Sequence, residues 1–152
     1  MRVGVRVIAA AAAALAAGWA AAAPEMAATD AADHPLAGAI VATADGARLT
    51  PAELAAALAA ADVAILGEVH DNPDHHAAQA WLVARMAPDA LAFEMLPPSV
   101  EAPLARARAA GADQQALAQA TGWADLGWPD FAMYAPIFLA APDVPVTGGA
   151  VA

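Results

Sequence analysis

The chain of 152 residues is long enough for one domain, and alanine contributes so much of its 61% hydrophobic content that few large side chains remain to form a core. The formal net charge of −10 at pH 7 makes a nucleic-acid partner unfavourable, because such a surface repels polyanions. The absence of cysteine excludes disulfides, cysteine metal sites and lipid attachment through an N-terminal cysteine.

Residues 1–22 are predicted to be a cleaved signal peptide. Arg2 and Arg6 precede an apolar run that starts at Val7, and small residues ending in Ala20–Ala22 follow. The run is shorter than the roughly twenty apolar residues that span a bilayer. We therefore expect export to the periplasm, a flexible lead-in over residues 23–35 and a single domain over residues 36–152.

The first half of this domain is predicted to alternate between strands and helices. A short β-like run at Ala39–Ala42 comes first, and Thr50, Pro51 and Glu53 form a capping box that starts a helix ending near Ala60. The continuous apolar run Val63–Leu66 is typical of a strand buried on both faces. Asn72 and Pro73 then start a helix that continues to about Met86.

The second half repeats the alternation. It is expected to contain a buried strand, three helices and a last strand, in the order Ala90–Leu96, Ser99–Ala110, Asp113–Ala120, the segment WPDFAMYAPIFLAA, and VPVTGGAVA. This order predicts an α/β fold with a partial parallel sheet and helices on its faces. Because the last apparent strand runs to the C-terminus, we expect the sheet to be incomplete there.

The segment AILGEVHDNPDHH concentrates histidines and acids directly after the first buried strand. Ligands of parallel sheets bind beyond the carboxyl ends of the strands. Glu68 and His70 lie at that end of the first strand, and Glu94 lies at the same end of the second. His75, in the first turn of the next helix, is expected to swing over them, so that all four side chains converge on one cleft.

Two kinds of chemistry are open to this cluster. His70, His75 and Glu94 are candidate ligands for a divalent metal such as zinc or manganese, and Glu68, His70 and Glu94 are candidate catalytic residues of a hydrolase. The spacing is not H-E-x-x-H. A structural role is the alternative for Glu68, and His76 is expected to be exposed. Burial of Glu94 within an apolar strand favours a functional role.

The segment TGWADLGWPDFAMYAPIF carries a second candidate site. Phe131, Tyr134 and Phe138 form one helical stripe, which predicts an aromatic core face. Tyr134 is also the only tyrosine, and a phenolate is an available axial ligand for ferric haem. Nearby aromatic and thioether side chains could line an apolar pocket; these are Trp123, Trp128 and Met133.

The segments ILGEVHDNPDHHAAQAWLV, LAFEML and WPDFAMYAPIF, in this order, resemble the ChaN family of haem-binding proteins in the Tiki/TraB/erythromycin-esterase superfamily. The resemblance covers about residues 35–148 and is most specific over Gly67–His76. It implies an α/β fold that binds haem rather than catalysing a reaction. It also implies a tyrosine as the iron ligand, for which Tyr134 is available, and a histidine among the groups near the propionates. Glu68, His70 and His75 are the further candidate haem-binding residues.

The same resemblance sets the expected biological role and its alternatives. It implies haem or iron uptake, a homodimer and cooperation with an outer-membrane haem or iron receptor. Members of the family continue beyond the point where this chain ends, so the domain is expected to be C-terminally truncated. The alternatives are a metal-dependent hydrolase of the superfamily's enzymatic type and an inactive domain fragment.

Overall fold

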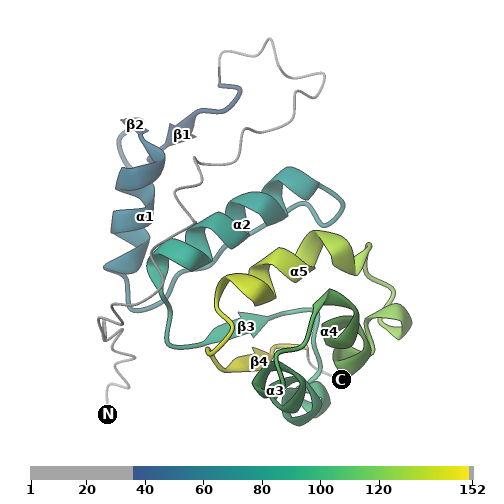
Figure 1. The fold of residues 1–152 in the computed structure, drawn as a ribbon. Coiled ribbons are helices and arrows are strands. Elements are labelled where there is room, and N and C mark those ends of the chain that lie inside the picture. Colours follow the sequence, from purple (N-terminus) through teal and green to yellow (C-terminus); the bar gives the residue numbers. More distant parts are fainter. Residues whose placement is uncertain (1–35, 151–152) are drawn as a thin grey trace.

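A computed structural model describes residues 36–150, and the predicted signal peptide and lead-in lie outside them. The described chain begins with a small hairpin in which β1 (Ile40–Val41) pairs antiparallel with β2 (Arg48–Leu49). Helix α1 (Pro51–Ala59) follows, and its predicted capping box is present between Thr50 and Glu53. The hairpin and α1 lie to one side of the remaining elements (Figure 1).

The remaining elements surround one small parallel pair of strands. They are α2 (Pro73–Met86), β3 (Leu91–Phe93), the 3-10 turn η1 (Pro98–Val100), α3 (Glu101–Ala109), α4 (Gln114–Thr121), the 3-10 turn η2 (Trp123–Asp125), α5 (Phe131–Ala140) and β4 (Val146–Gly148). Strands β3 and β4 run parallel, with Leu91 opposite Val146 and Phe93 opposite Gly148. The predicted α/β class is confirmed, with a sheet that is small.

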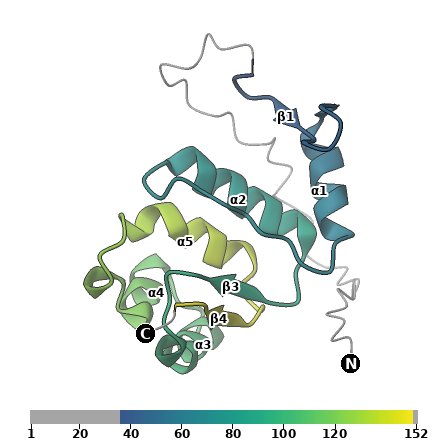
Figure 2. The same cartoon turned by 180° about the vertical axis from the view of Figure 1, so that it is seen from behind.

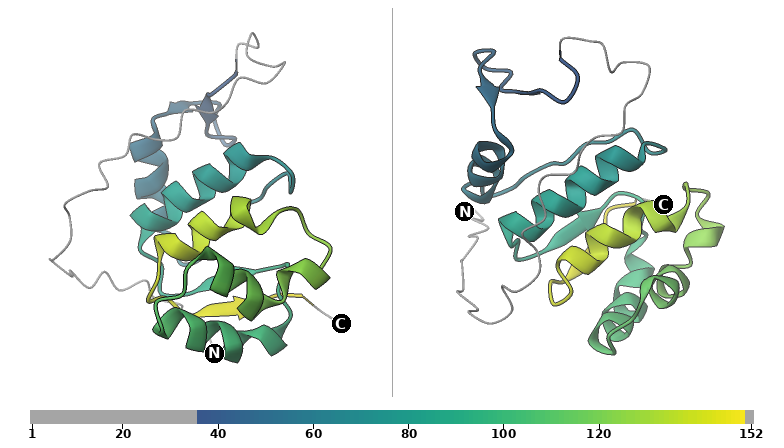
Figure 3. Two further views of the ribbon diagram at one scale, coloured as in Figure 1. Left: turned by 45° about the vertical axis from the view of Figure 1, so that its right-hand side comes forward. Right: turned by 45° about the horizontal axis from the view of Figure 1, so that its top comes forward.

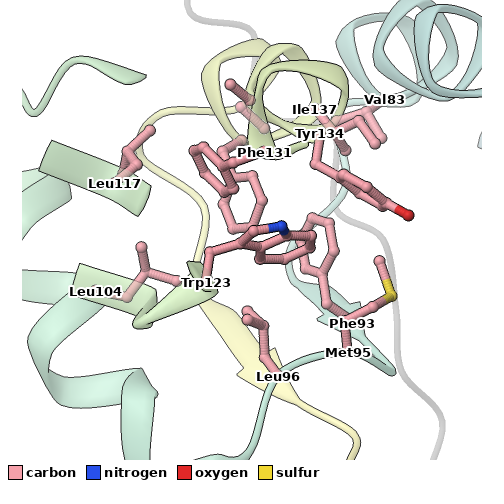
Figure 4. Close-up of a cluster of buried hydrophobic side chains, with 13 residues drawn as sticks. Val83, Phe93, Met95, Leu96, Leu104, Leu117, Trp123, Phe131, Tyr134 and Ile137 are labelled. Carbon is pink, nitrogen blue, oxygen red and sulfur yellow. The ribbon is translucent and has the colours of Figure 1, made fainter. Parts of the chain in front are cut away.

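Helices α2 and α5 lie side by side across one face of the β3–β4 pair, while α3 and α4 form a helical hairpin beside β4 (Figures 1 and 3). Phe93 of β3 stacks on Phe138 of α5 with ring centroids 4.3 Å apart. Trp123, Leu104 and Leu117 extend this cluster toward α3 and α4 (Figure 4). The core is therefore built from a few large side chains, as the alanine-rich composition requires.

Arg108 ties the end of α5 to α3. Its guanidinium donates hydrogen bonds to the carbonyl oxygens of Phe138 and Val144, both at 3.0 Å, and to that of Ala141. These carbonyls lie at the C-terminal end of α5 and in the turn that follows, where backbone acceptors lack helical partners. The contact fixes the direction in which the chain enters β4.

The prediction that Val63–Leu66 forms a strand buried on both faces of a sheet is wrong. The segment is extended, and the view from behind shows it running along α2 (Figure 2). Val63 and Ile65 are 69% and 90% exposed, while alternate residues turn inward. This two-residue period is that of a strand. No strand among residues 36–150 pairs with it, so the backbone lacks the partner that a ladder requires.

No helix within residues 36–150 is long and apolar enough to cross a bilayer.

Gly148 is predicted to be indispensable to the β3–β4 pair. A Cβ atom at this position would lie 2.4 Å from the carbonyl oxygen of Leu96 and 2.6 Å from the carbonyl carbon of Pro97, both backbone atoms. We expect Gly148→Ala to reduce the free energy of unfolding by about 1–3 kcal/mol, measured by urea denaturation. At Gly149 the nearest atoms would be 3.4 Å away, so Gly149→Ala is the matched control. Equal stability of the two variants would contradict this account.

Candidate functional site

The turn between the extended segment and α2 positions the candidate site. The Asn72 side chain caps α2 by accepting the N–H of Asp74 at 2.9 Å, and Pro73 occupies the first helical position. The N–H of Asn72 donates to the carbonyl of Val69 at 2.9 Å, which closes the turn. Glu68 and His70 are therefore held against the first two turns of α2.

Glu68 and His70 form the central pair. Nδ1 of His70 lies 2.8 Å from Oε1 of Glu68, and the two side chains are 44% and 6% exposed, respectively. The hydrogen bond to Glu68 raises the pKa of His70, and the charges of Glu68, Glu94 and Asp71 add to that effect against partial desolvation. With Nδ1 donating to the carboxylate, the lone pair of Nε2 is available to another group.

The ionised form of Glu68 is favoured by its neighbours. Burial alone would raise the pKa of its carboxyl, but hydrogen bonds from His70, Gln79 and Tyr134, with the charge of His76, outweigh burial and lower it. A buried carboxylate with several donors is stable as an anion. Glu68 can therefore orient His70 and polarise its imidazole.

Tyr134, which the sequence analysis assigned to a second candidate site, reaches the same pair from α5. Its side chain is fully buried, and its hydroxyl lies 3.0 Å from Oε1 of Glu68 and 3.1 Å from the carbonyl oxygen of His70. The hydroxyl points out of the hydrophobic cluster (Figure 4). Burial, followed by the hydrogen bond to Glu68, raises the pKa of the phenol above its usual range. Tyr134 would have to leave both contacts to bind an iron atom.

His76 is buried, and the expectation that it would be exposed is wrong. It has no exposed surface, and its ring centroid lies 4.0 Å from that of Tyr134. Its Nε2 lies 3.0 Å from the carbonyl oxygen of His70, and its Nδ1 lies 3.0 Å from Oε2 of Glu68. Sequence reasoning missed this residue. The sequence feature that could have identified it is its three-residue spacing to Gln79 along α2. The Gln79 amide also faces inward and donates to the carbonyl of Leu66 at 2.9 Å.

His75 contacts the backbone of the turn that carries Glu68 and His70. Its Nδ1 accepts the backbone N–H of Val69 at 2.8 Å. Glu94 does approach His70, with Oε1 4.0 Å from Nε2, but its side chain is 69% exposed, so the expected burial of this carboxylate is wrong. Among residues 36–150, no group of three or more histidines and acids is arranged to hold a metal ion.

The predicted aromatic segment supplies both core and site. Phe131, Tyr134 and Phe138 are buried as one stripe, which confirms the aromatic core face. Trp123 is also in the core, and its Nε1 donates to the carbonyl of Pro129 at 2.7 Å. Trp128 instead meets His70 edge-on, with ring centroids 4.9 Å apart. Trp128 is thus the tryptophan that borders the site.

Comparison with known proteins gives one family. The family model described as haem-binding uptake, Tiki superfamily, ChaN matches residues 54–151, well over half of the chain and including every candidate site residue. A search of curated proteins found no match. A search of solved structures also found none.

The raised pKa of His70 can be tested by NMR titration of its imidazole. We expect a midpoint above 6.5 in the unmodified chain and a lower midpoint in Glu68→Gln, which removes the carboxylate that raises it. Glu94→Gln is the matched control, because Glu94 has a smaller effect on His70. The stabilising effect of protonated His70 is present below pH 6.5 and is lost as the pH rises through the folded midpoint. A larger shift in Glu94→Gln would contradict the assignment.

His76 and His75 are predicted to differ in their effect on stability. His76→Ala removes the imidazole that contacts both the Glu68 carboxylate and the His70 carbonyl and leaves a space beside Tyr134, so we expect a loss of about 2–4 kcal/mol in the free energy of unfolding. His75→Ala removes one acceptor for the N–H of Val69, and we expect a loss of about 1 kcal/mol. Chemical denaturation followed by circular dichroism measures both. A smaller loss in His76→Ala than in His75→Ala would show that the buried network is not structural.

Proposed function

The chain belongs to the haem-binding uptake family ChaN of the Tiki superfamily, and we propose that it binds haem in the periplasm and takes part in haem or iron uptake. The observation that carries this proposal is the state of His70. One ring nitrogen is held by a buried carboxylate, while the other lies 4.0 Å from the exposed carboxylate of Glu94, and the ring meets Trp128 edge-on. That arrangement is typical of histidines that bind metals, because the second hydrogen bond fixes the ring and its tautomer.

His70 is the residue that we propose to contact the haem iron. Haem supplies an iron atom that accepts the lone pair of an imidazole nitrogen. Glu68 holds Nδ1 of His70 and makes Nε2 a stronger electron-pair donor to a metal. The Tyr134 hydroxyl in turn holds Glu68. In this proposal Tyr134 positions the carboxylate, whereas the sequence had suggested Tyr134 itself as the iron ligand. His75 contributes by holding the backbone of Val69.

The negative charges around His70 favour the ferric state of a haem iron bound there. Glu68, Glu94 and Asp71 all act on His70 through their charges. Negative charge near an iron centre stabilises its more positive oxidation state, and a histidine hydrogen-bonded to a carboxylate does the same. We therefore propose that the chain carries oxidised haem, as fits an exported protein.

The cellular setting is part of the proposal. The arrangement of Arg2, Arg6, the apolar run and Ala20–Ala22 supports export with cleavage after residue 22. A homodimer and an outer-membrane haem or iron receptor are the partners that we propose, on the basis of the family alone. Secretion of a tagged chain from a bacterial host, with N-terminal sequencing of the product, tests the export step.

Hydrolysis is the second candidate, and the Glu68–His70 pair is the observation that favours it. A carboxylate-oriented imidazole can act through its second nitrogen as a general base on water. Glu94 lies 4.0 Å from that nitrogen and could share the proton. Hydrolysis of a panel of esters that is abolished by His70→Ala, together with no saturable haem binding, would establish this alternative. Absence of both activities would leave the inactive-fragment hypothesis.

The ligand assignment is tested by titrating haemin into the chain and its variants. We expect saturable binding, a loss of about tenfold or more in affinity in His70→Ala, and retained imidazole coordination in Tyr134→Phe. Absorption and electron paramagnetic resonance spectra distinguish an imidazole from a phenolate ligand. Near-ultraviolet circular dichroism confirms that each variant is folded. A phenolate spectrum that disappears in Tyr134→Phe would replace His70 by Tyr134 as the ligand.

A further inference from the structure

An apolar groove separates the extended segment Val63–Leu66 from β3. It holds a cavity of about 600 Å³, and the side chains that line it include Leu66, Val83, Phe93 and Ile137. Strands that pair with each other lie only about 4.8 Å apart and leave no such space between their backbones. The groove is therefore a gap between two extended segments that do not reach each other.

Both walls of the groove are extended backbones that can form further hydrogen bonds. In β3, the N–H of Leu91 and the carbonyl oxygen of Phe93 are bonded on the β4 side of the pair. Successive residues of a strand direct their backbone groups to opposite edges, so the N–H and C=O of Ala92 face the groove. Across the groove, residues 63–65 make no backbone hydrogen bond within residues 36–150.

The two walls run in the same direction. His70, which follows the extended segment, approaches Glu94, which follows β3, with Nε2 4.0 Å from Oε1. The C-terminal ends of both walls therefore meet, and α2 makes the return crossing between them (Figure 2). Two parallel walls with a gap between them match the geometry of a sheet that lacks one inner strand.

The side chains of the walls determine what such a strand would look like. Leu66 and Phe93 turn inward, whereas Ile65 and Ala92 are exposed on the opposite face. A strand placed between the walls would have apolar neighbours on its inner face and solvent on its outer face. Every second residue of that strand should therefore be apolar.

The ends of the groove carry exposed carboxylates. Asp62 lies where the extended segment begins, and Glu94, with a side chain that is 69% exposed, lies where β3 ends. Basic residues at the two ends of a bound strand would complement these charges. The chain's own strands fit this description poorly, because those among residues 36–150 are two or three residues long and only β2 contains a basic residue.

We propose that the groove binds one strand of a partner protein by β-strand addition, and that this strand has apolar side chains at alternate positions and a basic residue at each end. Ala92 on one side and residues 63–65 on the other supply the main-chain hydrogen bonds, and the groove selects the side chains. The extended segment, the bound strand, β3 and β4 then form one sheet. This inference goes beyond the proposed haem function, because it needs neither His70 nor iron.

The test titrates the full chain with a labelled peptide of about seven residues, in which valine and threonine alternate between two terminal lysines, followed by fluorescence anisotropy. We expect saturable binding. Methylation of the valine backbone nitrogens should weaken binding by about tenfold or more, because it removes main-chain donors and keeps every side chain. Equal affinity of the methylated and unmethylated peptides, or no binding of either, would overturn strand addition.

Hydrogen exchange of single amides, measured by NMR, locates the bound strand. At saturating peptide the amide of Ala92 should exchange about tenfold or more slowly, because it gains an acceptor in the groove. The amide of Leu91 already donates to the carbonyl of Pro145 at 2.9 Å and is the internal control, with little change expected. Saturable binding without slower exchange at Ala92 would place the peptide elsewhere and refute the inference.

Charge variants test the ends of the groove. Asp62→Asn and Glu94→Gln should each weaken binding of the lysine-ended peptide by about twofold to fivefold at low ionic strength, the range for an exposed ion pair. Asp125→Asn is the matched control, because Asp125 is exposed in η2 and does not line the groove. If a peptide with terminal glutamates binds as tightly as the one with lysines, the proposed charge selection is wrong.

A groove-filling variant and the oligomeric state complete the test. Ala64→Leu places a larger side chain in the groove and should weaken peptide binding by about fivefold or more, whereas Ala102→Leu, on the exposed face of α3, should not. Sedimentation velocity of the chain alone reports self-association. A dimer that is disrupted by Ala64→Leu and does not bind the peptide would assign the groove to a second copy and overturn the proposal of a separate partner.

Discussion

The buried carboxylate of Glu68 is the constraint around which the site is organised. It receives a hydrogen bond from His70, another from Tyr134 of α5, and a contact of 3.0 Å from His76 of α2. An ionised carboxylate with so little exposed surface would be costly without these partners. The same partners connect the turn after the extended segment to both helices that cover the strand pair. Stability of the helix packing and orientation of His70 therefore depend on one anion.

This dependence connects the core to the chemistry. Tyr134 belongs to the aromatic cluster through its contact with Trp123, at 4.7 Å between ring centroids, and to the site through its hydroxyl. His76 likewise stacks on Tyr134 while it holds the carbonyl oxygen of His70. Because packing fixes the rings of Tyr134 and His76, their polar atoms already lie beside Glu68, and no side-chain entropy is lost to place them there. A site supported in this way keeps its geometry before a ligand binds.

Acidity distinguishes this site from one built to clamp a dianionic ligand. Three acidic residues, Glu68, Glu94 and Asp71, act on His70 through their charges. A histidine in such a field is suited to a ferric iron atom, which is positively charged, and poorly suited to the propionates of the same ligand.

The sequence by itself determined the helices, the α/β class and the site region, because capping residues, apolar runs and turn residues act over a few positions. Thr50, Asn72 and Asp113 all cap helices in the structure. The sequence also placed Glu68, His70, His75 and Glu94 at one end of the predicted sheet, but it treated Tyr134 as part of a separate candidate site. Tertiary structure alone decided which of His75 and His76 is buried. Neighbouring helical positions differ by about 100°, so these two lie at opposite margins of the inward face, and periodicity cannot rank them. Contact with Glu68 and Tyr134 selects His76. The local sequence likewise could not predict whether Val63–Leu66 pairs with another strand, because pairing depends on a backbone partner distant in sequence. None of the strands among residues 36–150 provides that partner.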